Sequence, residues 1–102
     1  MSFKKQYLKS HPICKVTFRM PKEAVDGAST VHIVGDFNDW NTNATPMKSL
    51  KTGDYMVIID LNTGREYQYR YLLDGTVWIN DWQADKYIPS YYGNVENSVI
   101  IL

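Results

Sequence analysis

Three tryptophans lie in polar stretches of the 102-residue sequence, at positions 40, 78 and 82. A large exposed ring is unfavourable in water unless a ligand or a partner covers it. A single loop tryptophan most often folds back over the core. Trp40, Trp78 and Trp82, taken together with tyrosines at 91 and 92, are harder to bury at one edge of a small domain. The sequence therefore suggests an aromatic platform at the surface.

Sugars are the ligand class that such a platform would suit. A sugar ring offers flat C–H patches to an aromatic face and hydroxyls to amides, guanidinium groups and carboxylates. The candidate hydroxyl partners are Gln68, Arg70, Asn80, Asn94 and Asn97. Nucleic-acid bases also stack on aromatic rings, but single-strand binders combine stacking with a basic groove. Because 11 Lys and Arg balance 11 Asp and Glu, a neutral sugar is favoured over nucleic acid.

Other chemistries find less support. Glycosidases use a pair of carboxylates, and the candidates would be Asp36, Asp39, Asp74, Asp81 and Asp85. The chain is too short for a cleft-forming enzyme domain, so we expect a protein that is not an enzyme and has no catalytic residues. Two histidines and one cysteine, Cys14, are too few for a metal site or an internal disulfide, and no phosphate-binding loop is present. We therefore expect no cofactor and no metal.

The length and hydropathy of the chain predict one domain that does not enter a membrane. A chain of 102 residues can bury one core but not two. The N-terminus has positive charge but lacks the apolar run of a signal peptide. The longest apolar runs, 56–59 and 99–102, are far shorter than the roughly 20 residues that a spanning helix needs. We expect a cytoplasmic protein that binds neither membranes nor nucleic acid.

The elements that must position the candidate residues are β-strands. Apolar residues alternate with polar ones between turn residues at short intervals, which is typical of an all-β fold. The expected strands are 14–20, 30–35, 54–61, 66–74, 76–80 and 97–102. About seven short strands favour an immunoglobulin-like β-sandwich, and a barrel is the weaker alternative. Residues 1–12 are expected to form an N-terminal extension to a domain at 13–102.

Strand parity predicts which side chains face the core, because residues two apart share a face. In segment 66–74 one face carries Tyr67, Tyr69, Tyr71 and Leu73, and the other carries Gln68, Arg70 and Leu72. The tyrosine face is assigned to the core, so Arg70 points away from it. In segment 76–80 the apolar pair Val77 and Ile79 is assigned to the core, which directs Trp78 outward.

Four motifs in order resemble carbohydrate-binding module family 48. They are Val-Gly-Asp-Phe-Asn-Asp-Trp at 34–40, Gly-Arg-Glu-Tyr-Gln-Tyr-Arg-Tyr at 64–71, Asp-Gly-Thr-Val-Trp at 74–78 and Gly-Asn-Val-Glu-Asn-Ser-Val at 93–99. The family includes the glycogen-binding domain of the AMP-activated protein kinase beta subunit and the early set domains of isoamylases and branching enzymes. The resemblance extends from about residue 14 to residue 102.

This resemblance implies an early set, immunoglobulin-like sandwich that binds α-1,4-glucans such as glycogen or starch. By its motifs, Trp40 and Trp78 would stack on glucose rings, and Arg70 takes the place of a lysine that is usual in the family. Tyr92 and Asn94 correspond to the residues on either side of the glycine in the last motif. Two departures are an extra residue between Asp-Gly and Trp78, and Glu96 in place of a sugar-contacting asparagine.

The predicted function is non-catalytic α-glucan binding. The candidate carbohydrate-binding residues are Trp40, Arg70, Trp78, Trp82, Tyr92, Asn94 and Asn97. The alternative is an interaction or regulatory adaptor module with the same fold, which targets or packs on a glycogen-metabolising enzyme.

Overall fold

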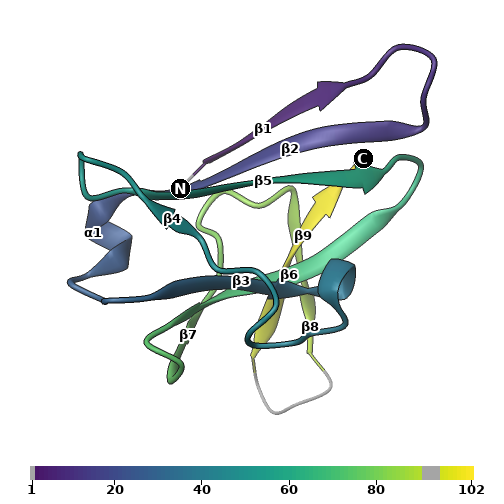
Figure 1. Ribbon diagram of the computed structural model, residues 1–102. Coiled ribbons are helices and arrows are strands. Elements are labelled where there is room, and N and C mark those ends of the chain that lie inside the picture. Colours follow the sequence, from purple (N-terminus) through teal and green to yellow (C-terminus); the bar gives the residue numbers. More distant parts are fainter. Residues whose placement is uncertain (1, 91–94) are drawn as a thin grey trace.

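A computed structural model describes residues 2–90 and 95–102 and shows two antiparallel β-sheets, one above the other in Figure 1. The first sheet has the order β1-β2-β5-β4, and its strands are β1 (Ser2–Tyr7), β2 (Ile13–Met20), β4 (Lys48–Ser49) and β5 (Tyr55–Asn62). The second sheet has the order β3-β6-β9-β8, with strands β3 (Val31–Gly35), β6 (Glu66–Leu73), β8 (Lys86–Pro89) and β9 (Glu96–Ile101). The short strand β7 (Val77–Ile79) also pairs with β6. These strands confirm the predicted all-β sandwich.

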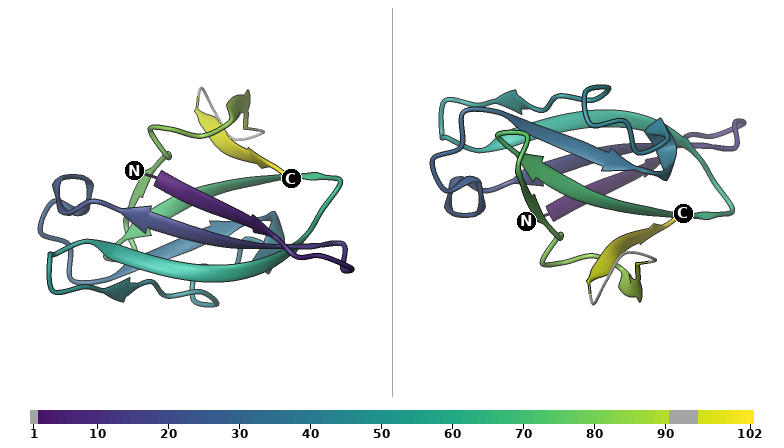
Figure 2. Two further views of the ribbon diagram at one scale, coloured as in Figure 1. Left: turned by 90° about the horizontal axis from the view of Figure 1, so that it is seen from above. Right: turned by 90° about the horizontal axis from the view of Figure 1, so that it is seen from below.

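Within the described residues, two short helical segments connect the strands. The four-residue helix α1 (Lys22–Val25) follows β2, and the 3-10 turn η1 (Asp36–Asn38) follows β3 directly. Figure 2, seen from above, shows β1, β2 and β5 side by side over the second sheet. The turn η1 lies at the end of β3, next to β6, so the residues after it can reach the outer face of the second sheet.

The core lies between the sheets and is built by alternation along the strands. Val16, Phe18 and Met20 of β2 are fully buried, and they face the buried Tyr69 and Tyr71 of β6. The ring of Tyr69 lies 5.3 Å from Phe18 and 5.9 Å from Tyr71, both edge to face. Such aromatic pairs stabilise a core beyond the area that they bury. The assignment of the β6 tyrosines to the core is confirmed.

The parity prediction for β7 is wrong at Val77. Ile79 packs against the core and Trp78 is 41% exposed, as expected, but Val77 is 53% exposed. The reason is its place: Val77 is the first residue of β7 and pairs with Leu73, the last residue of β6, where the two strands end. Leu72, on the outward face of β6, is buried, because it lies in a cross-strand row between His32 and Trp78.

The structure adds strands that the sequence analysis did not predict, namely β1, β4 and β8. Residues 2–7 of the predicted N-terminal extension form β1, which pairs with β2 along its whole length. Phe3 packs edge to face on Phe18, at 6.3 Å between ring centroids. The division of the chain at residue 12 stays a prediction. Among the described residues, no helix has the length and apolar composition needed to cross a membrane.

Asp81, one of the carboxylates weighed as a catalytic candidate, lies in the core instead. It is fully buried, and its carboxylate accepts hydrogen bonds from the hydroxyls of Tyr69 and Tyr71, at 2.8 and 3.3 Å. The backbone N–H of Gln83 donates to its other oxygen at 2.9 Å. Burial, with smaller contributions from the charge and hydrogen bond of Asp81, raises the pKa of Tyr71 well above its usual value of 10.0. The pKa of Tyr69 is raised in the same direction, again mainly by burial.

Candidate functional site

A cavity of about 810 Å³ lies on the outer face of the second sheet, opposite the core. The loop after β3, strands β6 and β7, and the β8–β9 hairpin all contribute to its lining. The lining residues are Asp36, Trp40, Thr42, Gln68, Arg70, Trp78, Ile88, Pro89, Ser90 and Asn97. A second hollow of about 590 Å³, between α1 and the β4–β5 turn, contains no tryptophan. The larger cavity is therefore the candidate site.

The first motif begins with a close approach between strands β3 and β6. A Cβ atom at Gly35 would lie 2.4 Å from the carbonyl oxygen of Gln68 and 2.7 Å from Cβ of Tyr69. Only glycine fits there without movement of β6. Two residues later, Phe37 turns inward and packs 6.1 Å from Phe18. The end of β3 is thus fixed against both sheets.

Asn38 closes the turn that leads to Trp40. Its side-chain oxygen accepts a hydrogen bond from the N–H of Gly35 at 3.0 Å, and its Nδ2 donates to the carbonyl of Ile33 and to Thr45 Oγ1. Asp39 and Trp40 both have left-handed backbones, with φ of 55° and 57°. This conformation is uncommon for residues other than glycine, although Asp adopts it more readily than most. The surrounding hydrogen bonds hold it in place and direct Trp40 toward the cavity.

The indole ring of Trp40 is held by a carboxylate. Its Nε1–H donates to Oδ1 of Asp36 at 2.9 Å. The other oxygen of Asp36 accepts the backbone N–H of Gln68 at 2.7 Å. Because β3 pairs with β6 only as far as Gly35 opposite Tyr69, the Asp36 carboxylate occupies the place where the next strand carbonyl would accept that N–H.

Arg70 and Trp78 form the other half of the site. The guanidinium carbon of Arg70 lies 5.8 Å from the centroid of the Trp78 ring, within the range of a cation–π interaction. Arg70 Nε donates to Oδ1 of Asn97 at 2.7 Å, and Asn97 Nδ2 donates to Oε1 of Gln68 at 3.0 Å. One chain of contacts therefore runs from Trp40 to Trp78 through Asp36, Gln68, Asn97 and Arg70.

The structure brings together four of the predicted site residues, Trp40, Arg70, Trp78 and Asn97. Trp82 is 60% exposed in the segment between β7 and β8, and it does not line the cavity. The predictions for Tyr92 and Asn94 fall outside the described residues.

Two amides predicted as hydroxyl partners are used within the protein. Asn97 is only 6% exposed, and both ends of its amide are engaged by neighbours. Asn80 donates from Nδ2 to the Glu96 carbonyl at 2.7 Å, and its oxygen accepts the backbone N–H of Ser98 at 3.0 Å. Asn80 therefore joins the segment after β7 to β9.

Sequence reasoning missed the role of Asp36 and the contribution of β8. The sequence analysis names Asp36 as a catalytic candidate. Its place four residues before Trp40, in a polar turn, is a signal for a local hydrogen bond. Ile88 and Pro89 line the cavity from β8, a four-residue strand whose short and mixed sequence has no clear alternation.

The charges of the site balance. Asp36 and Arg70 are the charged residues among those that line the cavity. Within residues 2–90 and 95–102, no group of three or more His, Cys, Asp or Glu side chains is arranged to hold a metal ion. Two rings, a guanidinium group and a neutral overall balance suit an uncharged ligand with flat faces and hydroxyls.

Comparison with known proteins shows the family of the chain. Residues 23–102 match the family described as the glycogen recognition site of AMP-activated protein kinase. The beta-2 subunits of 5'-AMP-activated protein kinase from Mus musculus and Homo sapiens are both 34% identical over 74 residues, which cover 72% of this chain and 26% and 25% of theirs. A 1,4-alpha-glucan branching enzyme from Butyrivibrio fibrisolvens is 35% identical over 60 residues, which cover 59% of this chain and 9% of the enzyme. The chain thus spans about a quarter of the kinase subunits that it matches.

Proposed function

Since the chain belongs to the family of the glycogen recognition site of AMP-activated protein kinase, we propose that its cavity binds α-1,4-glucan such as glycogen. In this proposal the rings of Trp40 and Trp78 stack on glucose units, and Arg70 donates to their hydroxyls. The supporting observation is that both rings and the guanidinium line one cavity on the outer face of the second sheet.

The geometry fits sugar recognition in two respects. A guanidinium carries five N–H donors, and Asn97 uses the one on Nε, so the terminal nitrogens of Arg70 carry the remaining donors. The carboxylate of Asp36 accepts hydrogen bonds from Trp40 and from the backbone of Gln68, and in this proposal it holds the Trp40 ring.

The proposed activity is binding without catalysis. The matched family is a recognition module, and Asp36 is the one carboxylate among the described residues that line the cavity, whereas glycoside hydrolysis uses two. An open platform of two or three stacked rings would gain roughly 4 to 6 kcal/mol, which corresponds to affinities from about millimolar to tens of micromolar.

Titration with maltoheptaose tests the proposal. We expect saturable changes in tryptophan fluorescence and in the backbone amide resonances of residues that line the cavity. Cellohexaose, which has β-1,4 linkages and a straighter chain, is the control and is expected to bind more weakly. No change in fluorescence or in the amide resonances at several millimolar maltoheptaose would contradict the proposal.

A second proposal concerns the setting of this module. The matched regions make up 26% of a kinase subunit and 9% of a branching enzyme, so in both relatives the module is a small part of a larger protein. We infer that this module brings a glycogen-metabolising enzyme to its polymer, in the cytoplasm. Co-sedimentation of a candidate enzyme with glycogen, with and without this protein, measures the targeting; equal sedimentation in both cases would contradict it.

A further inference from the structure

The side chain of Asp36 makes contacts that neither the family match nor the motif explains. It is an exposed residue, yet both of its carboxylate oxygens are engaged, one by the Trp40 indole and one by the Gln68 backbone. Hydrogen bonds to an ionised acceptor are stronger than those between neutral groups. Asp36 therefore links the ring of a loop residue directly to the central strand of the second sheet.

We propose that Asp36 is a positioning residue, which sets the orientation of the Trp40 ring before glucan binds. This inference rests on the proposed function. Asp36 acts through Trp40 and does not itself hold the sugar.

The backbone of the Trp40 loop explains why such a residue is needed. Asp39 and Trp40 have consecutive left-handed backbones, and the N–H of Trp40 donates to the carbonyl of Gly35 at 2.9 Å. These features fix the position of the Trp40 Cα. Backbone hydrogen bonds do not set the two χ angles of the side chain, and the bond from Nε1 to Asp36 selects one orientation. A ring held in advance loses less entropy on binding, which improves affinity.

The anchor at the other end of Asp36 is rigid. Gln68 lies in β6, which pairs with β3 on one side and with β9 on the other. The Gln68 side chain continues through Asn97 to Arg70, which lies beside Trp78. Trp40 and Trp78 are consequently both connected to strand β6 by these contacts, which fix the distance between the two rings.

The sharpest test compares Asp36→Asn with Asp39→Asn. Both changes remove one negative charge from the same loop, and Asn is tolerated in the left-handed conformation of residue 39. In the described part of the chain, the Asp39 side chain makes no hydrogen bond that would be lost. An amide at position 36 has one acceptor oxygen, so it can satisfy either the Trp40 indole or the Gln68 N–H but not both.

We expect Asp36→Asn to raise the Kd for maltoheptaose about threefold to tenfold, the range for loss of one net hydrogen bond. Asp39→Asn is expected to change the Kd by less than twofold. The indole N–H resonance of Trp40, identified by its absence in Trp40→Phe, should shift and exchange faster in Asp36→Asn alone. Asp36→Ser, which keeps one acceptor oxygen, replaces the asparagine variant if that variant melts below the assay temperature.

A double-mutant cycle with Trp40→Phe shows whether Asp36 acts through the ring. Phenylalanine lacks the N–H, so Asp36→Asn in that background should change the Kd by less than twofold. An equal loss in both backgrounds would mean that Asp36 contacts the sugar itself or supports only the strand, and would overturn the inference. Unchanged affinity in Asp36→Ala, which leaves the Trp40 indole no acceptor at position 36, would also overturn it. Failure of the unsubstituted protein to bind maltoheptaose is a different result, because it removes the proposed function first.

Discussion

Asp81 is an unusual core residue, because its buried carboxylate accepts hydrogen bonds from two tyrosine hydroxyls and one backbone N–H. These bonds require Tyr69 and Tyr71 to stay protonated. Burial raises the pKa of both phenols far above 10.0 in the folded protein, whereas in the unfolded chain they ionise near their usual pKa. The two tyrosines therefore make the stability of the fold depend on pH in the alkaline range.

We expect the free energy of unfolding to be insensitive to these phenols below about pH 10 and to fall above it. The folded state holds two protons that the unfolded state releases, so stability is lost at about 1.4 kcal/mol per pH unit for each tyrosine. Urea unfolding between pH 9 and pH 11.5 measures the slope. Tyr71→Phe should reduce the slope to about half, and a slope that is equal in both proteins would contradict the assignment.

For individual residues, the sequence predicted Trp40, Arg70 and Trp78 as candidate site residues but did not predict the contacts of Asp36. The three residues follow from motifs and from strand parity, which are local properties. The contact of Asp36 with the Gln68 backbone depends on where β3 stops pairing with β6, and that point is set by Gly35 and the packing of Phe37. The position of Asn97 in a buried amide network was likewise not visible in sequence.

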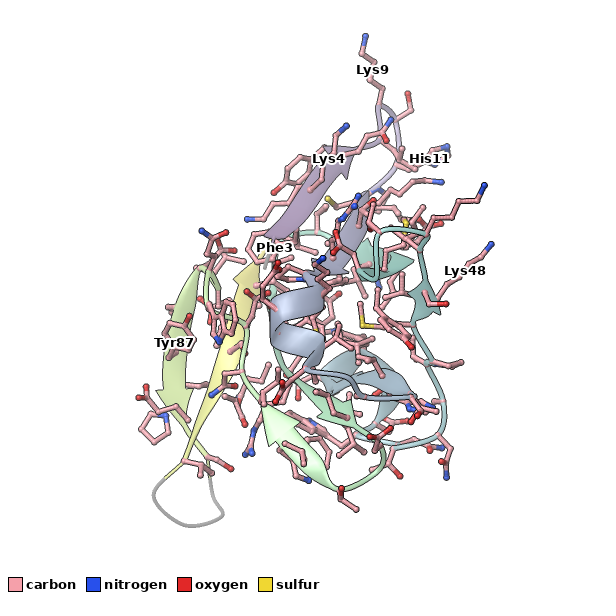
Figure 3. All side chains as sticks on the ribbon, turned by 90° about the vertical axis from the view of Figure 1, so that its left-hand side faces the viewer. Phe3, Lys4, Lys9, His11, Lys48 and Tyr87 are labelled. Carbon is pink, nitrogen blue, oxygen red and sulfur yellow. The ribbon has the colours of Figure 1, made fainter. Side chains whose placement is uncertain are left out.

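Among the elements, β2, β3, β5, β6, β7 and β9 were predictable, because each has a clear alternation or a buried apolar run. The strands that were missed are short or lie at sheet edges: β4 has two residues and β8 has four. Strand β1 carries lysines, which are common on edge strands because they discourage pairing with other chains. In Figure 3, Lys9 of the turn after β1 and Lys48 of the edge strand β4 point away from the ribbon.

The side chain of Lys5 links strand β1 to the second sheet. Lys5 Nζ donates to the Asp85 carboxylate at 2.8 Å and to the carbonyl of Ile101 at 2.9 Å. Asp85 in turn accepts the N–H of Ile101 at 2.7 Å. The contact joins the first strand of the chain to the last.

Lys5→Ala is expected to lower the free energy of unfolding by about 1 kcal/mol, since the ion pair is partly shielded from solvent and reinforced by a backbone acceptor. Lys4→Ala, one residue away on the opposite face of β1, is the matched control and should change it by less than about 0.5 kcal/mol. Urea unfolding at low and high salt measures both. Equal effects of the two substitutions would show that Lys5 contributes only general charge.

For the whole molecule, the core and the cavity lie on opposite faces of the second sheet, so they can be altered separately. Trp78 is 41% exposed and Trp40 is half-buried, and neither belongs to the core between the sheets. Trp40→Ala combined with Trp78→Ala is therefore expected to abolish retention on glycogen and to change the melting temperature by only a few degrees. A loss of several kcal/mol of stability would instead show that the two rings are core residues.

Strand β6 belongs to both faces. Its tyrosines fill the core, and between them Gln68 and Arg70 line the cavity. Deleting one residue within this strand would exchange its two faces, moving a guanidinium into the core and phenols into the cavity. Attempts to redesign ligand preference should therefore leave β6 untouched and vary positions such as Thr42 in the loop after β3, where a change of side chain does not alter the strand that the core depends on.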